Sequence, residues 1–395
     1  MSLDIAAISD RLSQEAEAVC RHYLSHGHRQ GHYWIVGDVN NTKGRSLFVR
    51  LRDDGSGHRA GKWHDAATGQ YGDLIDLIGL SCGLTCLPQA LKEAKRFLAL
   101  PDTVTDNPYR PYPPPATAPY PDGTSHSARK LFRASRPIMG TIAHTYLSQR
   151  AIGDIGFDPD LLRFHPTCYY YDLTTGHCHT LPALIAAVSE GSGRIVGIQR
   201  IYLDPRLGAL NGLGLTDGQP FDLRHGGKAD MDSPKRCLGQ IAGHGVRLGH
   251  VKEVMAVGEG LETVLSLKCL LPDMPMIAAL SASNLSHLIL PIGLKRLYIL
   301  CDNDPAGLNA AGTLYERAMD AGIKAYRLKP RLNDLNDDLR LLGLLSCLCH
   351  IKAQLCAQDG SYLRPDPSSL ACSAMGGTNH GHNLSPSGRK PDPAF

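Results

Sequence analysis

The sequence predicts an α/β fold, in which a parallel sheet with helices on both faces follows a smaller α+β unit and a short N-terminal unit. Three observations support this prediction. Apolar runs and helical patterns alternate strictly between residues 252 and 328, a Pro-rich stretch interrupts the chain after residue 100, and acidic residues follow several of the apolar runs. Strict alternation of this kind is typical of a parallel sheet that is covered by helices.

The first unit is expected over residues 1–99. A helical pattern from Leu3 to Leu24 leads into the strand-like segments HYWIVGDV and RSLFVRLR, and GDLIDLI predicts a helix near the end of the unit. Trp34 and Trp63 are either core residues or platforms on which bases stack. We favour the core, because aromatic side chains of small domains usually pack inside.

Residues 100–129 are predicted to form an extended linker. The segment from Pro101 to Ser127 holds eight prolines and almost no apolar periodicity, a composition that suits an extended chain better than a folded element. A loop packed on one of its neighbours is the alternative. The linker is therefore expected to separate the first unit from the rest of the chain.

An α+β unit is expected over residues 130–250. GTIAHTYLSQRAI predicts a helix, and LPALIAAVSEGSGRIVGIQRIYLD predicts two strands joined by a turn at Glu190 to Gly193. The segment from Cys168 to His179, CYYYDLTTGHCH, offers Cys and His side chains that suit zinc. It lacks paired CxxC spacing, so a hairpin is favoured and no structural zinc is expected.

The parallel sheet is expected over residues 251–340. Its predicted strands are VMAV, MIAAL, LYIL and KAYRL, with helices from Leu261, after Ser283 and from Pro305. Residues 341–395 are predicted to begin with an apolar, Cys-containing helix and to end in a disordered segment rich in Gly, Ser, Asn and Pro.

Acidic residues gather where three of the predicted strands end. In chain order they are Glu259, then Asp302 and Asp304, then Asp334, Asp337 and Asp338. Ligands of open parallel sheets bind beyond the carboxyl ends of the strands, because loops and helix N-termini converge there. Gathered carboxylates repel one another unless a hard cation neutralises them, so the pattern predicts a site for magnesium, with manganese as the alternative.

Two of the acidic residues have simpler interpretations. Asp304 precedes Pro305 and suits the cap of a helix, and Glu262 suits the solvated face of one. A single Asp-x-Asp pattern fits a metal ligand and a cap equally well. Acidic clusters at three strand ends favour the metal.

The motif EG at Glu259, followed by DNDPAG from Asp302, resembles the Toprim domain, the catalytic fold shared by bacterial DNA primases, type IA and II topoisomerases and some nucleases. The resemblance covers Val251 to Leu339. It implies that Glu259 is a general acid/base or a metal ligand, and that Asp302 and Asp304 hold magnesium.

The third acidic cluster departs from the Toprim pattern. Asn336 stands between Asp334 and Asp337, which leaves open which residue completes the metal site. Asp334 and Asp337 are both candidate metal ligands.

The sequence before the Toprim-like segment resembles the N-terminal half of the bacterial primase catalytic core. There a hairpin that ends in Gly and Arg, and then a Lys-containing segment, present basic groups to the template and the nucleotide. The resemblance places these groups at Arg200 and Lys235, with Arg236 and Arg247 as further candidates. Cations beside a carboxylate-held metal suit a triphosphate and a nucleic-acid backbone, although a lone Arg is often only a surface residue.

The N-terminal unit is similar to the zinc-binding domain of primases in its order of two strands, a Gly-rich turn and the GDLIDLI helix. The metal cysteines of that domain are missing, so the resemblance implies a zinc-ribbon-like domain without its ligands. Primase-like proteins of plasmids, phages and integrative elements show this zinc-free arrangement.

These resemblances imply a magnesium-dependent DNA primase, a nucleotidyltransferase that makes primers on single-stranded DNA from nucleoside triphosphates during replication or transfer of a mobile element. The sequence after Leu339 resembles neither a helicase domain nor a helicase-binding bundle, so the protein would need a separate helicase or none. A Toprim nuclease and a non-catalytic module for strand binding or replication recruitment are the alternatives.

Charge and hydropathy limit the remaining classes. The net charge of +3 is too small to indicate nucleic-acid binding by itself. No unbroken apolar run reaches membrane-spanning length, and the acidic N-terminus does not fit a signal peptide. A cytoplasmic protein without membrane contact is expected.

Overall fold

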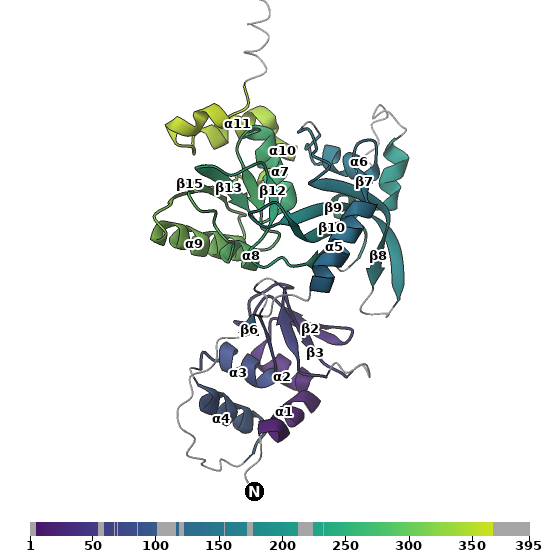
Figure 1. Cartoon of the computed structure of the whole chain (residues 1–395), viewed down its shortest axis with the longest axis vertical. Coiled ribbons are helices and arrows are strands. Elements are labelled where there is room, and N and C mark those ends of the chain that lie inside the picture. The colour runs from purple at the N-terminus through teal and green to yellow at the C-terminus, as the bar shows by residue number, and fades with distance from the viewer. Residues whose placement is uncertain are drawn as a thin grey trace, which may run out of the picture.

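The structure, a computed structural model, contains three sheets that follow one another along the chain (Figure 1). It describes residues 5–53, 59–66, 68, 70–84, 86–100, 116–117, 122–153, 155–171, 177–211, 224–231 and 233–365. Among these residues, no helix is both long enough and apolar enough to cross a membrane.

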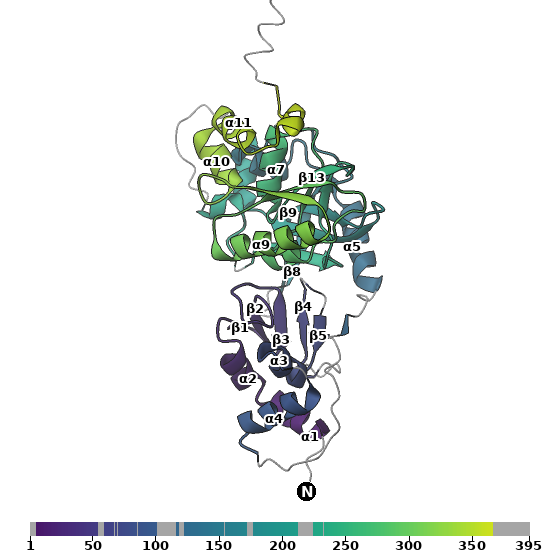
Figure 2. The ribbon, with the colours of Figure 1, turned by 90° about the vertical axis from the view of Figure 1, so that its left-hand side faces the viewer.

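The N-terminal unit packs four helices against a six-stranded antiparallel sheet with the strand order β1-β2-β3-β4-β5-β6. Figures 1 and 2 show these helices on the side of the sheet that faces away from the rest of the chain. The elements are α1 (Ile5–Gln14), α2 (Ala16–Tyr23), β1 (His28–Gln30), β2 (Tyr33–Val36), β3 (Leu47–Arg50), β4 (Trp63–Asp65), β5 (Gln70–Gly72), α3 (Leu74–Ser81), α4 (Leu87–Phe97) and β6 (Ala116–Thr117).

Both tryptophans lie in the core of this unit, as predicted. Trp34 and Trp63 are 3% and 2% exposed, and their indole nitrogens donate to the backbone oxygens of Leu24 and Asp73 at 3.0 and 2.8 Å. Neither ring is available to stack on a base. The predicted likeness of this unit to a zinc-binding domain stays a prediction.

The predicted linker over residues 100–129 is wrong at its C-terminal end. Helix α5 (Asp122–Ala134) begins within it, and β6 pairs with β5 of the first sheet. The helix forms because Ala128 and Phe132, one helical turn apart, are buried against the second sheet. Most of the Pro-rich stretch, residues 101–115 and 118–121, lies outside the described residues.

The second sheet is antiparallel, with the order β11-β10-β9-β8-β7. The predicted hairpin near Cys168 is confirmed, since Tyr171 at the end of β8 pairs with Cys178 at the start of β9. The elements are β7 (Arg136–Pro137), α6 (Ile142–Gln149), β8 (Leu162–Tyr171), β9 (Cys178–Ser189), β10 (Ile195–Tyr202), the 3-10 helices η1 (Pro205–Asn211) and η2 (Arg224–Gly227), and β11 (Lys235–Gly239).

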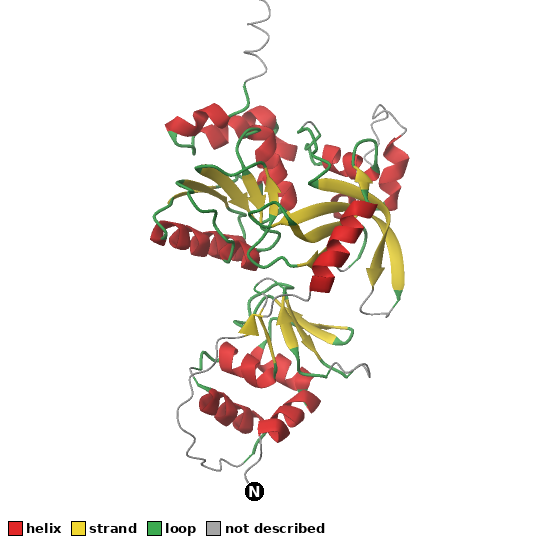
Figure 3. Cartoon of the chain, viewed as in Figure 1, coloured by secondary structure: helices red, strands yellow, loops and turns green. Residues whose placement is uncertain are grey.

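The third sheet has the order β12-β14-β13-β15-β16, and its last four strands run parallel while β12 is antiparallel. Figure 3 shows helices on both faces of this sheet, which confirms the predicted parallel α/β arrangement. The elements are β12 (Val246–Leu248), β13 (Val254–Gly258), α7 (Leu261–Leu270), β14 (Met276–Ala278), α8 (Ala282–Ser286), β15 (Arg296–Leu300), α9 (Pro305–Asp320), β16 (Lys324–Leu328), α10 (Leu335–Leu342), α11 (Leu344–Lys352) and the 3-10 helix η3 (Ala357–Tyr362).

One apolar core joins the second sheet to the third. Leu184 and Val188 of β9 belong to the same cluster of buried side chains as Ala256 of β13 and Leu265 of α7. The other face of the third sheet has a separate core, in which β13 and β15 pack against α8 and α9. The two sheets therefore share α7 at their junction.

The C-terminal segment is fixed to the amino end of β15 by a buried ion pair. Asp359 of η3 is 1% exposed and accepts hydrogen bonds from Arg296 Nε and Nη2 at 2.9 and 2.8 Å and from Tyr298 Oη at 2.7 Å. The predicted Cys-containing helix is α11, and the predicted disordered segment from residue 366 onward lies outside the described residues.

This ion pair gives a prediction for stability. Asp359→Asn removes the carboxylate charge that the half-buried Arg296 guanidinium and the buried Tyr298 hydroxyl contact, so we expect the free energy of unfolding to fall by about 2 kcal/mol. Urea unfolding monitored by far-UV circular dichroism measures the change. Asp320→Asn, at an exposed position, is the control and should unfold like the wild type. Equal midpoints for both variants would contradict the prediction.

Candidate active site

Three parallel strands bring acidic residues to one edge of the third sheet. Glu259 follows β13, Asp302 and Asp304 follow β15, and Asp334 lies in the loop after β16. β15 pairs with β13 on one side and with β16 on the other. The charges of Glu259, Asp304 and Asp334 all act on Asp302, as the predicted topology requires.

Asp302 is the least satisfied of these carboxylates. Its Oδ1 atom is buried and has no hydrogen-bond partner among the described residues. Burial, followed by the charges of Glu259, Asp334 and Asp304, raises the pKa of Asp302 to about 7. Gly307, in the first turn of α9, lies close to Asp302. A Cβ at position 307 would lie 3.1 Å from the Asp302 backbone oxygen, so the absence of a side chain lets the helix start pack closely against Asp302.

Glu259 and Asp304 differ in their surroundings. Burial and the charge of Asp304 raise the pKa of Glu259, whereas the charge of Lys235 and a backbone hydrogen bond from Ala282 lower it. Asp304 is exposed and caps α9, since the Gly307 amide donates to its Oδ1 at 2.7 Å. The cap that the sequence offered as an alternative is present, and it engages only one of the two carboxylate oxygens of Asp304.

The structure divides the third acidic cluster. Asp334 caps α10 by accepting from the Asp337 amide at 2.8 Å, and burial raises its pKa. The Asp337 carboxylate lies 3.6 Å from Arg340, and Asp338 accepts from the Arg331 amide at 2.7 Å. Of this cluster, Asp334 is the member whose charge raises the pKa of Asp302, after burial and the charge of Glu259, and it is therefore the candidate to complete the acidic site.

The donor set fits a hard divalent cation, although its geometry is not that of a closed metal site. Among the described residues, no three His, Cys, Asp or Glu side chains are arranged to hold a metal ion. The buried, unpartnered oxygen of Asp302 and the raised pKa values of Asp302, Glu259 and Asp334 are what repelling carboxylates show without a cation. Oxygen donors of this kind suit magnesium or manganese.

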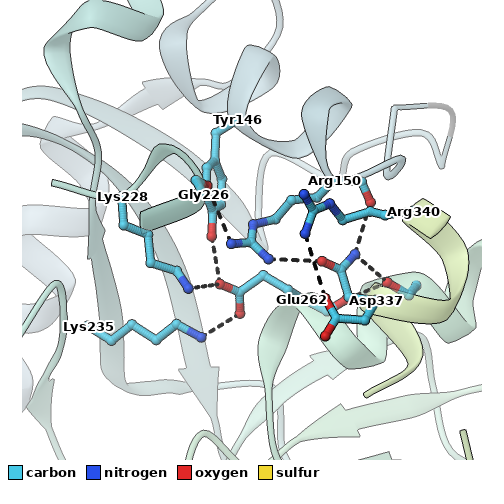
Figure 4. Close-up of polar contacts among 10 residues, drawn as sticks. Tyr146, Arg150, Gly226, Lys228, Lys235, Glu262, Asp337 and Arg340 are labelled. Atoms are coloured by element: carbon cyan, nitrogen blue, oxygen red, sulfur yellow. Dashed lines mark hydrogen bonds and ion pairs between the residues drawn. The ribbon is translucent and has the colours of Figure 1, made fainter. Parts of the chain in front are cut away.

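The simpler interpretation of Glu262, a solvated helix face, is wrong. Its side chain is 5% exposed, and its oxygens accept from Tyr146 Oη and Lys235 Nζ, both at 2.7 Å (Figure 4). Lys228 Nζ lies 3.6 Å away. The charges of Lys235, Lys228 and Arg150 outweigh burial and hold the pKa of Glu262 well below its usual range.

The cations around Glu262 outnumber it, and sequence reasoning missed two of them. Burial lowers the pKa of Lys228 to about 8, and the charges of Lys235 and Arg150 act in the same direction. Arg150 Nη1 donates to Asn336 Oδ1 at 2.9 Å, and Asn336 Nδ2 donates to Ser266 Oγ at 2.9 Å (Figure 4). The Asn336 side chain therefore connects α6, α7 and α10, and both its amide oxygen and its amide nitrogen form hydrogen bonds within the protein.

Of the four predicted basic residues, Arg200, Lys235 and Arg236 lie on the second sheet and Arg247 lies on the third. Lys235 and Arg236 are neighbours on β11, so their side chains point to opposite faces. Lys235 points toward α7, whereas Arg236 lies directly opposite Arg200 in the ladder. Arg247, on β12, donates to the Ser189 backbone oxygen at 3.0 Å. The structure thus pairs Lys235 with Glu262, where its charge still acts on Glu259 and Asp302, and it places Arg200 and Arg236 together elsewhere.

Arg200 and Arg236 lie with three tyrosines in an aromatic-basic surface, of which Tyr169 and Arg236 are the accessible members, because Arg200, Tyr170 and Tyr202 are buried. The Arg200 guanidinium lies 5.2 Å from the ring centre of Tyr169 and 5.9 Å from that of Tyr202, and Arg236 lies 4.2 Å from that of Tyr170. Arg200 is 7% exposed and its Nε atom has no hydrogen-bond partner. Burial, and to a smaller extent the charge of Arg200, lowers the pKa of Arg236.

Two family models match parts of the chain. Residues 254–344 match the Toprim domain, and residues 122–248 match a domain of unknown function, DUF7146. The chain therefore carries a Toprim domain, as the motifs at Glu259 and Asp302 predicted. No curated protein matches the sequence.

The solved structures with similar folds include three primases. The zinc-binding and RNA polymerase domains of the Aquifex aeolicus primase align over 88% of this chain and 85% of their own, with 14% identity and a TM-score of 0.39. The RNA polymerase domain of the Mycobacterium tuberculosis primase, solved with double-stranded DNA, aligns over 64% of this chain and 95% of its own, with 12% identity and a TM-score of 0.33. The primase fragment of the bacteriophage T7 primase-helicase aligns over 45% of this chain and 63% of its own, with 14% identity and a TM-score of 0.30. Similarity at this level transfers no activity to this chain.

The raised pKa of Asp302 predicts how stability depends on pH in the absence of divalent cations. The pKa is about 7 in the folded chain, against about 3.9 for an unperturbed Asp, so between these values the folded state keeps a proton that the unfolded state has lost. Stability therefore falls as the pH rises from about 4 to about 7 and levels off above pH 7, and below pH 4 the penalty is absent.

We therefore expect Asp302→Asn to be more stable than the wild type at pH 8, by on the order of 2–4 kcal/mol, with the difference vanishing toward pH 4. Urea unfolding in EDTA across this range measures the difference, with Asp320→Asn as the control. A difference that stays constant with pH would contradict the assignment.

Proposed function

We propose that the chain is a DNA primase-like, metal-dependent nucleotidyltransferase that makes primers on single-stranded DNA for a mobile element. The observation that carries this proposal is Asp302, whose buried, unpartnered carboxylate oxygen faces the charges of three further acidic side chains. Such a group requires a divalent cation once it is ionised at neutral pH. The Toprim domain supports the same assignment.

Each acidic residue has its own part in this proposal. Asp302, Asp304 and Asp334 would hold the cation, which orients phosphates and stabilises charge on the attacking and leaving oxygens. Glu259, with its raised pKa and its position after β13, is suited to accept the proton of the attacking 3′ hydroxyl or to complete the metal site. Asp337 is a weaker candidate for a metal ligand than the sequence indicated, because Arg340 lies 3.6 Å from its carboxylate.

The basic residues divide between the two polyanions. Lys235 lies beside the acidic site and is suited to the phosphates of a nucleoside triphosphate. The half-buried Arg236 and the 46% exposed Tyr169 are suited to the backbone and bases of a single strand, whereas the buried Arg200 would act through its contact with the Tyr169 ring. Arg247 is a further candidate for the nucleic acid.

A second candidate function is a strand-binding or recruitment module that keeps the Toprim fold without turnover. One observation favours it: within the described parts of the chain, the acidic side chains are not arranged as a closed metal site. A Toprim nuclease would use the same carboxylates, and the experiment below separates the three.

Incorporation of labelled nucleotides on unprimed single-stranded DNA, with magnesium or manganese, tests the catalytic proposal. We expect product from the wild type and a loss of at least a hundredfold in Asp302→Ala and in Glu259→Gln, because each removes a carboxylate from the site. Glu253→Gln is the matched control, since Glu253 is an exposed carboxylate at the other end of β13.

Three outcomes are informative. Activity that persists in both site variants would refute the assigned residues. Metal-dependent cleavage of the DNA without primer synthesis would identify a nuclease, and strand binding without any turnover would identify the recruitment module.

The aromatic-basic surface makes a separate prediction for strand binding. We expect Arg236→Ala to weaken binding of an oligothymidylate and to reduce the slope of log K against log salt by about 0.7, the change for one phosphate contact on a single strand. Fluorescence anisotropy at four salt concentrations measures both quantities. Lys295→Ala, which removes an exposed cation paired with Glu253, should leave them unchanged. Equal slopes for Arg236→Ala and the wild type would place the strand elsewhere.

A further inference from the structure

The first turn of α7 separates two groups of charge. Glu259, just before the helix, belongs with Asp302 and Asp304, whereas Glu262, one turn later, is surrounded by cations. Across the described part of the chain, no Lys, Arg or His nitrogen lies within 4.0 Å of the carboxylates of Glu259, Asp302 or Asp304. The cations nearest to the acidic site are thus engaged by a different carboxylate.

Lys235 is the cation that can move between these groups. Its ammonium lies 2.7 Å from Glu262, its side chain is 36% exposed, and its charge reaches both Glu259 and Asp302. A lysine has a flexible four-carbon stem, so a modest rotation carries its charge to a new partner. Lys228, with a side chain that is 19% exposed, has less freedom.

Glu262 itself is fixed. Tyr146 of α6 donates to its Oε1 at 2.7 Å, and the helix that carries it contributes Leu261, Val264 and Leu265 to the core shared by two sheets. A side chain that is held on this many sides can act as an anchor for a mobile neighbour.

We propose that Glu262 is a positioning residue that anchors Lys235 away from the acidic cluster and so leaves Glu259 and Asp302 available to a divalent cation. The proposal rests on the metal site of the proposed function and not on nucleotidyl transfer. Without Glu262, three cations would repel one another, and Lys235 would move toward the nearest uncompensated carboxylates. A lysine ammonium there competes directly with the metal.

Manganese binding to the full chain, measured by isothermal titration calorimetry and by electron paramagnetic resonance of free Mn²⁺, tests this proposal without any nucleotide. We expect Glu262→Gln to weaken Mn²⁺ binding about tenfold, which corresponds to 1.4 kcal/mol. We expect Glu262→Gln/Lys235→Met to regain the wild-type affinity, because the competing ammonium is gone.

Asp359→Asn is the matched control for a purely structural effect. Asp359, like Glu262, is a buried carboxylate with a basic partner at 2.8 Å and a tyrosine hydroxyl at 2.7 Å, but it lies at the amino end of β15, away from the acidic site. It should lower the melting temperature and leave Mn²⁺ affinity unchanged. The proposal is overturned if Glu262→Gln also loses only thermal stability.

Lys235→Met alone keeps the proposal testable even if Glu262→Gln does not fold. It should bind Mn²⁺ as tightly as the wild type or up to about threefold more tightly, because one nearby positive charge is removed. Weaker binding would mean that Lys235 assists the metal and would overturn the proposal. Failure of the wild type to bind Mn²⁺ refutes this proposal and the metal site together, whereas Mn²⁺ binding with the expected variants but no primer synthesis refutes only the transferase.

Discussion

A carboxylate buried between two sheets must be neutralised by the elements that bury it, and the Glu262 carboxylate meets this requirement from both sides of the junction. It belongs to α7 of the Toprim domain, while its partners Tyr146, Lys228 and Lys235 all come from the preceding α+β unit. The surrounding apolar core provides attraction without direction. Charged contacts with fixed geometry therefore determine how the two units are aligned, and with that alignment they place Lys235 at the edge of the acidic site.

Asn336 extends the same constraint to the other end of the site. The hydrogen bonds of its side-chain amide with Arg150 and Ser266 hold the first turn of α10 against α6 and α7. Because the helix is held in this rotation, Asp334 lies near Asp302, and Asp337, three residues later, lies near Arg340. Asn336, the residue that departs from the Toprim pattern, thus has a structural role. Its contacts hold α10 so that Asp334, and not Asp337, lies near Asp302.

The sequence predicted the parallel sheet and the acidic edge well, for a clear reason. Strands such as LYIL are short apolar runs between helices, and parallel strands necessarily end at a common edge, so Glu259, Asp302 and Asp334 could be placed together without coordinates. The partners of Glu262 could not be predicted in this way. The helix around Glu262 is apolar on nearly every side, which indicates that the acid is buried, but its partners come from residues more than 25 positions away.

The arginines show a second limit of sequence reasoning. Residues next to each other on a strand point to opposite faces, so the separation of Lys235 from Arg236 was predictable. The position of Arg200 was not, because it depends on the register between β10 and β11, which no local pattern specifies. Helix α5 was missed for a related reason, since only two of its apolar residues, Ala128 and Phe132, contact the sheet strongly enough to be buried, and its start is polar.

The short strand β6 limits how far the N-terminal unit can lie from the second sheet. β6 ends at Thr117 as part of the first sheet, and α5, which packs on the second, begins at Asp122. Five residue steps span at most about 18 Å even when fully extended. The end of β6 and the start of α5 are therefore held within this distance of each other, so the chain itself limits how far the first sheet can separate from the second.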